Sequence, residues 1–216
     1  MKLQANLYIV SLLGLAFALA QQVDLEALQL GSRSAKEWIK QLEGPERLAG
    51  LRADDILKVL GLKDGDIVAD IGSGTGVLSR PMARKVAPTG RVLAVEVDQE
   101  LLDYIDERSA QEKLGDILTV LGEFQDPKLP TNDVDVAFFH NTLHHIKDRV
   151  GYLKLLASHL TPEGRMVVID MIDGHKDDPE MQIDVESVVG WMKAAGFQRS
   201  QQIDLFEDKF FLVFRR

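Results

Sequence analysis

Hydrophobic residues along this chain gather in short runs that are separated by longer stretches of mixed character. Five runs rich in Val, Ile and Leu predict buried strands, over residues 67–71, 91–97, 117–121, 136–139 and 165–172. The stretches between them carry apolar residues at helical spacing, and one such helix is expected over residues 149–160. Alternating segments at 197–206 and 209–214 predict a final hairpin. This order predicts an α/β fold with a mostly parallel sheet.

The first twenty residues form a separate unit. A short positive start, Met1-Lys2, precedes an apolar run from Leu7 to Ala20, and Ala18-Leu19-Ala20 is a typical cleavage pattern. Residues 1–20 are therefore predicted to be a signal peptide, with a buried N-terminal helix as the alternative. The run is short for a membrane-spanning helix, so membrane contact is expected only through this segment if it is not cleaved.

Residues 21–45 are predicted to form an N-terminal helical lid or cap. Ser34 is a candidate N-cap for a helix that carries Trp38 and Leu42 on one face. This helix could either cover a site or pack on the core, and the sequence leaves both open. A further helix is expected over residues 52–60.

The stretch 67–78 is the most informative for function, because an apolar strand runs directly into the motif Asp70-x-Gly72-x-Gly74-x-Gly76. A strand that turns sharply into a helix through glycines predicts a ligand-binding turn. The dinucleotide fingerprint would need a glycine where Val77 stands, and Asp70 would repel a pyrophosphate. An acid here favours a cationic ligand instead, so a nicotinamide-dependent oxidoreductase is the disfavoured reading.

This motif resembles motif I of the class I S-adenosylmethionine (SAM) dependent methyltransferases. Residues 135–148 resemble the segment after the fourth strand in the small-molecule methyltransferases of the quinone-biosynthesis type. The resemblance defines a predicted domain of residues 46–216. It implies a doubly wound, mostly parallel, seven-stranded Rossmann-like sheet with helices on both faces and an antiparallel last strand. It also implies SAM as cofactor and S-adenosylhomocysteine as product.

The resemblance places the cofactor at the carboxyl ends of the strands. It implies that the methionine moiety lies near Asp70 and Gly72, the ribose at Glu96, and the adenine at Glu123 and Phe124. A carboxylate at Glu96 is suited to accept both ribose hydroxyls, although a plain surface acid is the alternative. The expected cofactor-binding residues are Asp70, Gly72, Ser73, Gly74, Gly76, Glu96, Val97, Glu123, Phe124, His140 and Asn141.

Three histidines, His140, His144 and His145, follow the fourth predicted strand, toward which the methyl group is expected to point. Methyl transfer needs a general base only when the acceptor must lose a proton, and histidine suits that role near neutral pH. These three residues are the catalytic candidates, with a structural packing role as the alternative for each.

A metal-assisted reaction is the weaker possibility at this site. Oxygen ligands for it would come from Asp170, Asp173, His175 and Asp177. The catechol-type enzymes carry an acid where this chain has His140, so no metal is expected.

Composition narrows the range of acceptors. The formal net charge of −9 argues against nucleic acid as a partner, because phosphate binding depends on clustered Lys and Arg. The chain has no cysteine, which excludes thiolate metal sites and cysteine nucleophiles. Cytosine C5 methylation and arsenic methylation both need thiols and are excluded with them.

We therefore expect a SAM-dependent methyltransferase that acts on a small-molecule or lipid-like acceptor. The signal-like segment predicts export, whereas the cytoplasmic synthesis of SAM favours a cytoplasmic location as the alternative. The same segment supports a rival function, an exported non-catalytic protein that binds SAM or a nucleoside with the methyltransferase fold. The oligomeric state is not predicted by any feature of the sequence.

Overall fold

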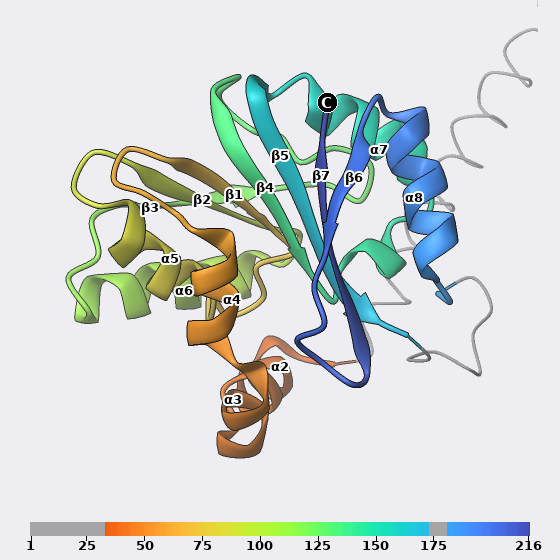
Figure 1. Ribbon diagram of the computed structural model, residues 1–216. Coiled ribbons are helices and arrows are strands. Elements are labelled where there is room, and N and C mark those ends of the chain that lie inside the picture. The colour runs from red at the N-terminus through yellow and green to blue at the C-terminus, as the bar shows by residue number, and fades with distance from the viewer. Residues whose placement is uncertain (1–32, 173–180) are drawn as a thin grey trace, which may run out of the picture.

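The computed structural model describes residues 33–172 and 181–216 (Figure 1). The signal-peptide prediction for residues 1–20, residues 21–32 of the expected lid, and the loop that holds Asp173, His175 and Asp177 lie outside the described residues. Among the helices of the described ranges, none is long and apolar enough to cross a membrane.

Seven strands form one sheet at the centre of the molecule. Their order is β3-β2-β1-β4-β5-β7-β6. The strands are β1 (Ile67–Ile71), β2 (Arg91–Glu96), β3 (Ile117–Leu121), β4 (Val134–His140), β5 (Leu160–Met171), β6 (Gln198–Gln202) and β7 (Lys209–Arg215). Strands β1 to β5 pair in parallel, while β7 is antiparallel to both β5 and β6. This confirms the predicted doubly wound, mostly parallel sheet with an antiparallel last strand.

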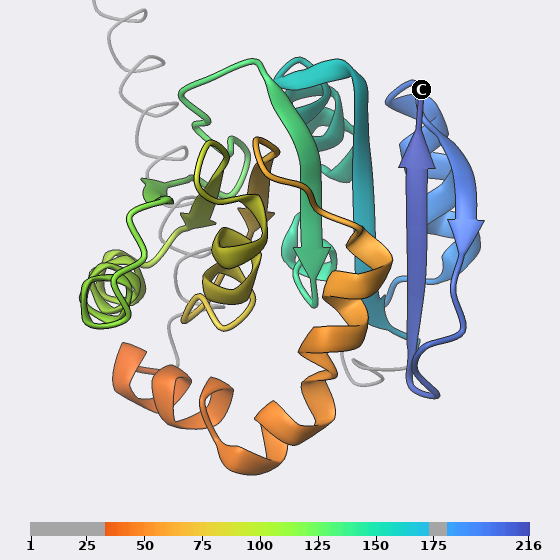
Figure 2. The ribbon, with the colours of Figure 1, turned by 60° about the vertical axis from the view of Figure 1, so that its left-hand side comes forward.

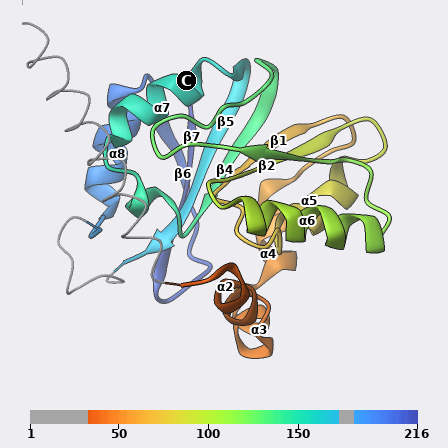
Figure 3. The same ribbon diagram turned by 180° about the vertical axis from the view of Figure 1, so that it is seen from behind.

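Alternation of side chains along the strands places helices on both faces. Val68 and Val136 belong to the cluster that packs on α4 (Ala53–Leu60) and α5 (Ser79–Val86), whereas their neighbours Ala69 and Ala137 face the opposite way. The opposite face is covered by α7 (Arg149–Ala157) and α8 (Val185–Ala194). Figure 3 shows these two helices together at one end, away from α4, α5 and α6 (Gln99–Gln111).

The N-terminal helices lie at the carboxyl ends of the parallel strands, beyond the tip of β4 in Figure 2. As predicted, Ser34 caps α2 (Ala35–Leu42): its side chain accepts from the Glu37 amide, and Glu37 bonds back to complete a capping box. Helix α3 (Pro45–Leu51) was not predicted. It is separated from α4 by Arg52, whose left-handed backbone (φ 53°) breaks the helix.

Three predicted boundaries differ from the structure. Helix α7 ends at Ala157, before the expected Leu160. Strand β5 begins at Leu160, before the expected residue 165, and its register against β4 shifts between Val134 and Val136. Strand β6 covers only five residues, all exposed, because it forms the outer edge of the sheet.

Candidate functional site

A cavity of about 940 Å³ lies at the carboxyl ends of the strands, where the sheet order reverses between β1 and β4. All three candidate histidines line it, together with every predicted cofactor-binding residue except Gly76. Gly76 instead packs toward α6, since a Cβ added to it would lie 3.0 Å from Cγ1 of Ile105. The fold thus brings predicted site residues as far apart in sequence as Asp70 and His145 to one cavity, as the topology requires.

Backbone hydrogen bonds hold the glycine turn against β2. Gly72 and Ser73 both donate their amides to the carbonyl of Val95, at 2.9 Å each. Gly72 has a φ of +68°, and a Cβ on it would lie 2.3 Å from Cγ2 of Thr142. A side chain at this position is therefore opposed both by backbone strain and by close contact with the segment after β4.

Glu96 is the last residue of β2, and its carboxylate faces the glycine turn. It accepts hydrogen bonds from the amides of Gly74 at 2.9 Å and Val97 at 2.7 Å. Burial raises the pKa of Glu96, and these backbone bonds act in the opposite direction. The acid predicted from its spacing is thus fixed in place within the cavity wall.

Asp70 is 3% exposed at the end of β1 and accepts a hydrogen bond from the Ser79 hydroxyl. Burial raises the pKa of Asp70 to about 7, with a smaller contribution in the same direction from Glu96. Two carboxylates that share a buried wall favour a positively charged neighbour.

Glu123 and Phe124 line the cavity beyond β3. The Glu123 side chain is 66% exposed, and its carboxylate lies 3.2 Å from the ammonium of Lys128. Glu123 is thus the least enclosed of the predicted cofactor residues, and its carboxylate already has a cationic partner.

The histidines after β4 differ sharply in their surroundings. His144 is buried, and its Nδ1 lies 2.7 Å from Oδ1 of Asp170, which is also buried. The rings of His144 and His145 are 4.1 Å apart. His140 stacks beside Phe138 with an angle of 11° between the rings. Within the described residues, the carboxylate of Asp170 therefore orients the ring of His144.

Burial lowers the pKa of His140 to about 3, and the positive charges of Arg47 and Lys209 act in the same direction. Asp170 opposes them only weakly. The imidazole of His140 is thus held neutral at physiological pH.

Several buried polar atoms of the cavity wall make no hydrogen bond with the described residues. They are Oγ of Ser73, Oγ1 of Thr75, Nε2 of His140 and Oδ1 of Asn141. Because buried polar groups are nearly always paired, such atoms together mark a wall built to meet polar groups of a ligand.

Residues 68–164 match the family model described as a methyltransferase domain. A ubiquinone/menaquinone biosynthesis C-methyltransferase, UbiE, of Ectopseudomonas mendocina is 27% identical over 115 residues, which is 53% of this chain and 45% of that protein. An arsenite methyltransferase of Halobacterium salinarum is 25% identical over 171 residues, or 72% of this chain and 44% of that protein. The chain thus spans less than half the length of these curated relatives.

A crystal structure of a SAM-dependent methyltransferase from Aquifex aeolicus superposes with a TM-score of 0.76. It is 25% identical in sequence, and the match covers 85% of this chain and 98% of that one. Residues 68–164 therefore carry a methyltransferase domain, and the fold around them is that of a class I SAM-dependent methyltransferase. The cofactor of this chain is accordingly SAM, as the glycine motif predicts.

The methyltransferase cavity fits this cofactor on its own chemistry. SAM carries a positive sulfonium, an ammonium and two ribose hydroxyls, and the wall offers the buried acid Asp70 and the partly buried acid Glu96. The lack of a side chain at Gly72 lets the turn lie close to Thr142. The unpaired oxygens of Ser73 and Asn141 add acceptors beside it.

The metal alternative gains nothing from the structure of the methyltransferase domain. Within residues 33–172 and 181–216, no group of three His, Cys, Asp or Glu side chains is arranged to hold a metal ion. Asp170, one of the proposed ligands, is engaged with His144 and with the amide of Met171.

Sequence reasoning missed the residues that the N-terminal helices and β7 bring to the methyltransferase site. Arg47, Leu51 and Lys209 line the cavity. Arg47 lies in a helix that was not predicted, and Lys209 reaches the site only because β7 runs antiparallel, so that its first residue meets the carboxyl ends. Neither residue belongs to a motif that points to it.

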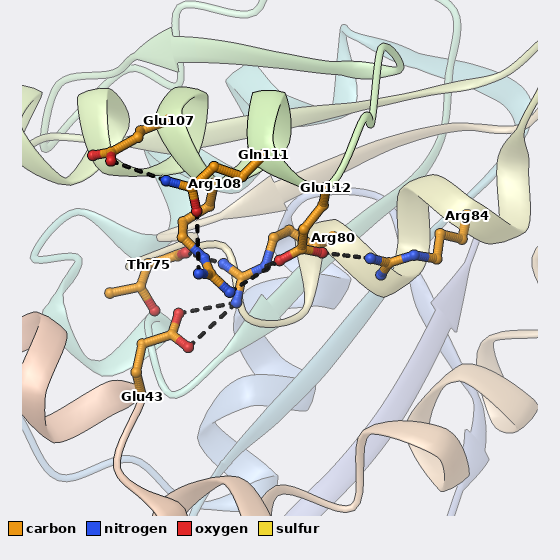
Figure 4. A network of polar contacts seen from close by, with 8 residues as sticks. All are labelled: Glu43, Thr75, Arg80, Arg84, Glu107, Arg108, Gln111 and Glu112. Carbon is orange, nitrogen blue, oxygen red and sulfur yellow. Dashed lines mark hydrogen bonds and ion pairs between the residues drawn. The ribbon is translucent and has the colours of Figure 1, made fainter.

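A buried arginine ties the N-terminal helices to the methyltransferase domain (Figure 4). Arg80 of α5 has a side chain only 8% exposed and donates to the carbonyl of Thr75 at 2.7 Å. Its guanidinium also contacts Glu43 at 3.0 Å, just after α2, and Glu112 at 3.2 Å, just after α6. Leu42, next to Glu43, lies directly over Gly74. The end of α2, in the segment predicted to be a lid or cap, is therefore in contact with the glycine turn.

Proposed function

We propose that this chain transfers a methyl group from SAM to a small-molecule or lipid-like acceptor. The observation that carries the proposal is the continuity of the cavity, which is lined by the glycine turn and Glu96 as well as by His140 and His144. Direct transfer requires that donor and acceptor lie in one space in fixed alignment, and alignment alone can contribute several orders of magnitude in rate.

The donor half of the cavity is assigned to the residues before β4. In this proposal Glu96 receives the ribose hydroxyls, and Asp70 with the Gly72 region receives the methionine moiety. Glu123 and Phe124 flank the adenine. SAM, when bound, supplies a methyl group that its sulfonium has already activated. The protein has to orient the acceptor and, where the acceptor is a hydroxyl or a carbon acid, to remove a proton.

His144 is the residue we assign as general base. Its Nδ1 is bonded to the Asp170 carboxylate at 2.7 Å, which fixes the ring and favours a proton on that nitrogen. The other nitrogen, Nε2, then carries no proton and can take one from the methyl acceptor. His144 also lines the cavity, as the role requires. The carboxylate of Asp170 stabilises the imidazolium that proton transfer creates.

His140 is a poor base by comparison. With a pKa of about 3, its imidazole has little affinity for a proton at neutral pH. We assign it a contact role, as a neutral hydrogen-bonding group beside the reacting atoms. Of the three histidines predicted as catalytic, His140 is thus distinguished by its lowered pKa and His144 by its carboxylate partner.

The acceptor is small or narrow in this proposal, because one cavity has to hold both reactants. Apolar side chains contribute to its wall, among them Trp38, Leu51, Ile146 and Met171. Arsenic is disfavoured as the acceptor because the chain has no cysteine. An organic acceptor with an apolar body fits the wall.

Calorimetric titration of the full chain with SAM, S-adenosylhomocysteine and NAD tests the donor half. We expect both adenosyl ligands to bind and NAD not to bind. Asp70→Ala should weaken adenosyl binding at least tenfold, whereas Asp54→Ala, which removes an exposed acid from α4, should leave it unchanged. A folded protein that binds neither adenosyl ligand would contradict the proposal.

Release of S-adenosylhomocysteine from SAM in the presence of quinols, phenols and hydroxylated fatty acids tests the acceptor half. Turnover with any of them, lost in His144→Gln, supports the enzyme. SAM binding without turnover on the whole panel would favour the non-catalytic binding protein instead.

A further inference from the structure

Charge is divided along the edge of the sheet where the cavity opens. The acids Asp70, Glu96 and Glu123 stand at or just after β1, β2 and β3, which are neighbours at one side of the sheet. The cavity wall also carries Arg47 of α3 and Lys209 at the start of β7, a strand that lies beyond β4 and β5 in the sheet. A cavity with an acidic end and a basic end is suited to two ligands of opposite charge.

Arg47 is partly buried. It lies in α3, and burial lowers the pKa of its guanidinium while the negative charge of Asp208 raises it. Among the residues that the structure describes, no carboxylate forms an ion pair with Arg47, and Asp208 acts on it only from a distance. A partly buried guanidinium without an ion-pair partner favours an anion that can supply one.

Lys209 belongs to the sheet and not to the N-terminal helices. It is the first residue of β7 and pairs with Met171 of β5, which also lines the cavity. Its side chain is only 11% exposed, and its ammonium lies 5.1 Å from the centre of the Phe206 ring. Asp208 neutralises it in part at 2.7 Å, but that carboxylate is 69% exposed and faces water. An ammonium has three donors, so donors remain for a ligand.

Both cations act on the imidazole of His140, which indicates that they lie near each other. Arg47 and Lys209 each lower the pKa of His140, after the larger effect of burial. The nearby acid, Asp170, is engaged with His144. Arg33, a further cation of the wall, lies over the Trp38 ring and bonds to Gln41, away from this group. Among the charged groups that act on His140, the cations Arg47 and Lys209 therefore outnumber the single acid Asp170.

We propose that the methyl acceptor bears a carboxylate, which Arg47 and Lys209 bind beside His140. The inference rests on the proposed function and adds the charge of the substrate. A guanidinium binds a carboxylate through two parallel hydrogen bonds, and the ammonium adds a charge-assisted bond from the other side. The same cations repel the sulfonium of the donor, so they sort the two ligands to opposite ends. The apolar body of the acceptor then lies against Leu51 and Met171.

The experiment compares acids with uncharged partners of the same shape on the full chain. The protein is first saturated with S-adenosylhomocysteine and then titrated with 4-hydroxybenzoate or 4-hydroxybenzamide, and with 3-hydroxydecanoate or its amide. We expect at least one acid to bind at least tenfold more tightly than its amide. Arg47→Gln and Lys209→Met should each reduce this preference to less than threefold.

Lys58→Gln is the matched control, because it removes one exposed positive charge from the neighbouring helix α4. It should keep the full preference. Circular dichroism and the melting temperature establish that each variant is folded. Arg47→Lys, which keeps the positive charge, should retain more of the preference for acids than Arg47→Gln.

Each outcome decides a different point. Failure of the wild-type protein to bind S-adenosylhomocysteine overturns the proposed function and this inference with it. Binding of S-adenosylhomocysteine without any preference for acids overturns this inference alone. Tighter binding of phenyl phosphate than of any carboxylate replaces the carboxylate by a phosphate. Loss of S-adenosylhomocysteine affinity in Arg47→Gln assigns that cation to the methionine carboxylate of the cofactor and overturns its acceptor role.

Discussion

Asp170 at the end of β5 holds Nδ1 of His144 through a hydrogen bond of 2.7 Å, and both side chains are almost fully buried. Asp170→Asn removes the charge while keeping the shape, so we expect kcat to fall by roughly 10 to 100-fold with KM for SAM unchanged. Steady-state kinetics with an acceptor identified from the panel measures both.

A double-mutant cycle distinguishes this role from simple packing. If Asp170 acts through His144, Asp170→Asn should cost little more once His144→Gln is present. Losses that multiply in the double variant would show that the two residues act independently.

Gly72→Ala should disrupt the cofactor end of the site. The added Cβ meets Cγ2 of Thr142 at 2.3 Å, and φ at this position is +68°, so we expect a loss of roughly 1–3 kcal/mol in the free energy of unfolding. Affinity for S-adenosylhomocysteine should fall at least tenfold by calorimetry.

Thr142→Ala offers a test of this cause. It removes Cγ2 and Oγ1, the two closest atoms, and leaves only Cβ at 3.0 Å from the added carbon. Gly72→Ala should therefore be partly rescued in the Thr142→Ala background. An equal loss in both backgrounds would mean that backbone strain, and not the contact, is responsible.

Stability should depend on the protonation of Asp70. Its folded-state pKa of about 7 lies above the value near 4 of an unfolded chain, so the folded state binds more protons between about pH 4 and pH 7. Asp70 therefore makes the free energy of unfolding fall as pH rises through this window. Urea unfolding of Asp70→Asn should show a flatter pH dependence there, while the exposed-acid variant Asp54→Asn keeps the wild-type slope.

The ion pair between Arg80 and Glu43 should control how firmly α2 is held over the glycine turn. Glu43→Gln weakens the attraction at 3.0 Å without removing the other contacts of Arg80. We expect faster amide hydrogen exchange in residues 35–42 and little change in β1. Lys40→Gln, which alters an exposed residue of the same helix, is the control. Unchanged exchange in the Glu43 variant would mean that Leu42 alone holds the helix.

The sheet and its glycine turn could be predicted because local chemistry determines them. Apolar runs identified β1 to β5, and the spacing from Asp70 to Gly76 identified the turn. Ser34 was recognisable as an N-cap, and its side chain accepts a hydrogen bond from its helix. These features depend on neighbours in sequence, which is why the chain alone reveals them.

Other features depend on contacts between distant segments and left no local signal. Arg52 adopts a left-handed conformation with its guanidinium bonded to Leu205, so α3 and α4 could not be separated by pattern. The pairing of His144 with Asp170 joins segments 26 residues apart. Whether an acid near a histidine is a partner or a metal ligand follows only from their relative positions in the fold.

Strand β7 follows β6 in the sequence but lies between β5 and β6 in the sheet. In the described part of the chain, β6 pairs with no strand other than β7, so during synthesis β6 has no partner strand until β7 has been made. Lys209, the first residue of β7, reaches the cavity in the same step. A nascent chain could thus fold the glycine turn and its acids early, yet it would have no complete acceptor site until β7 has been made.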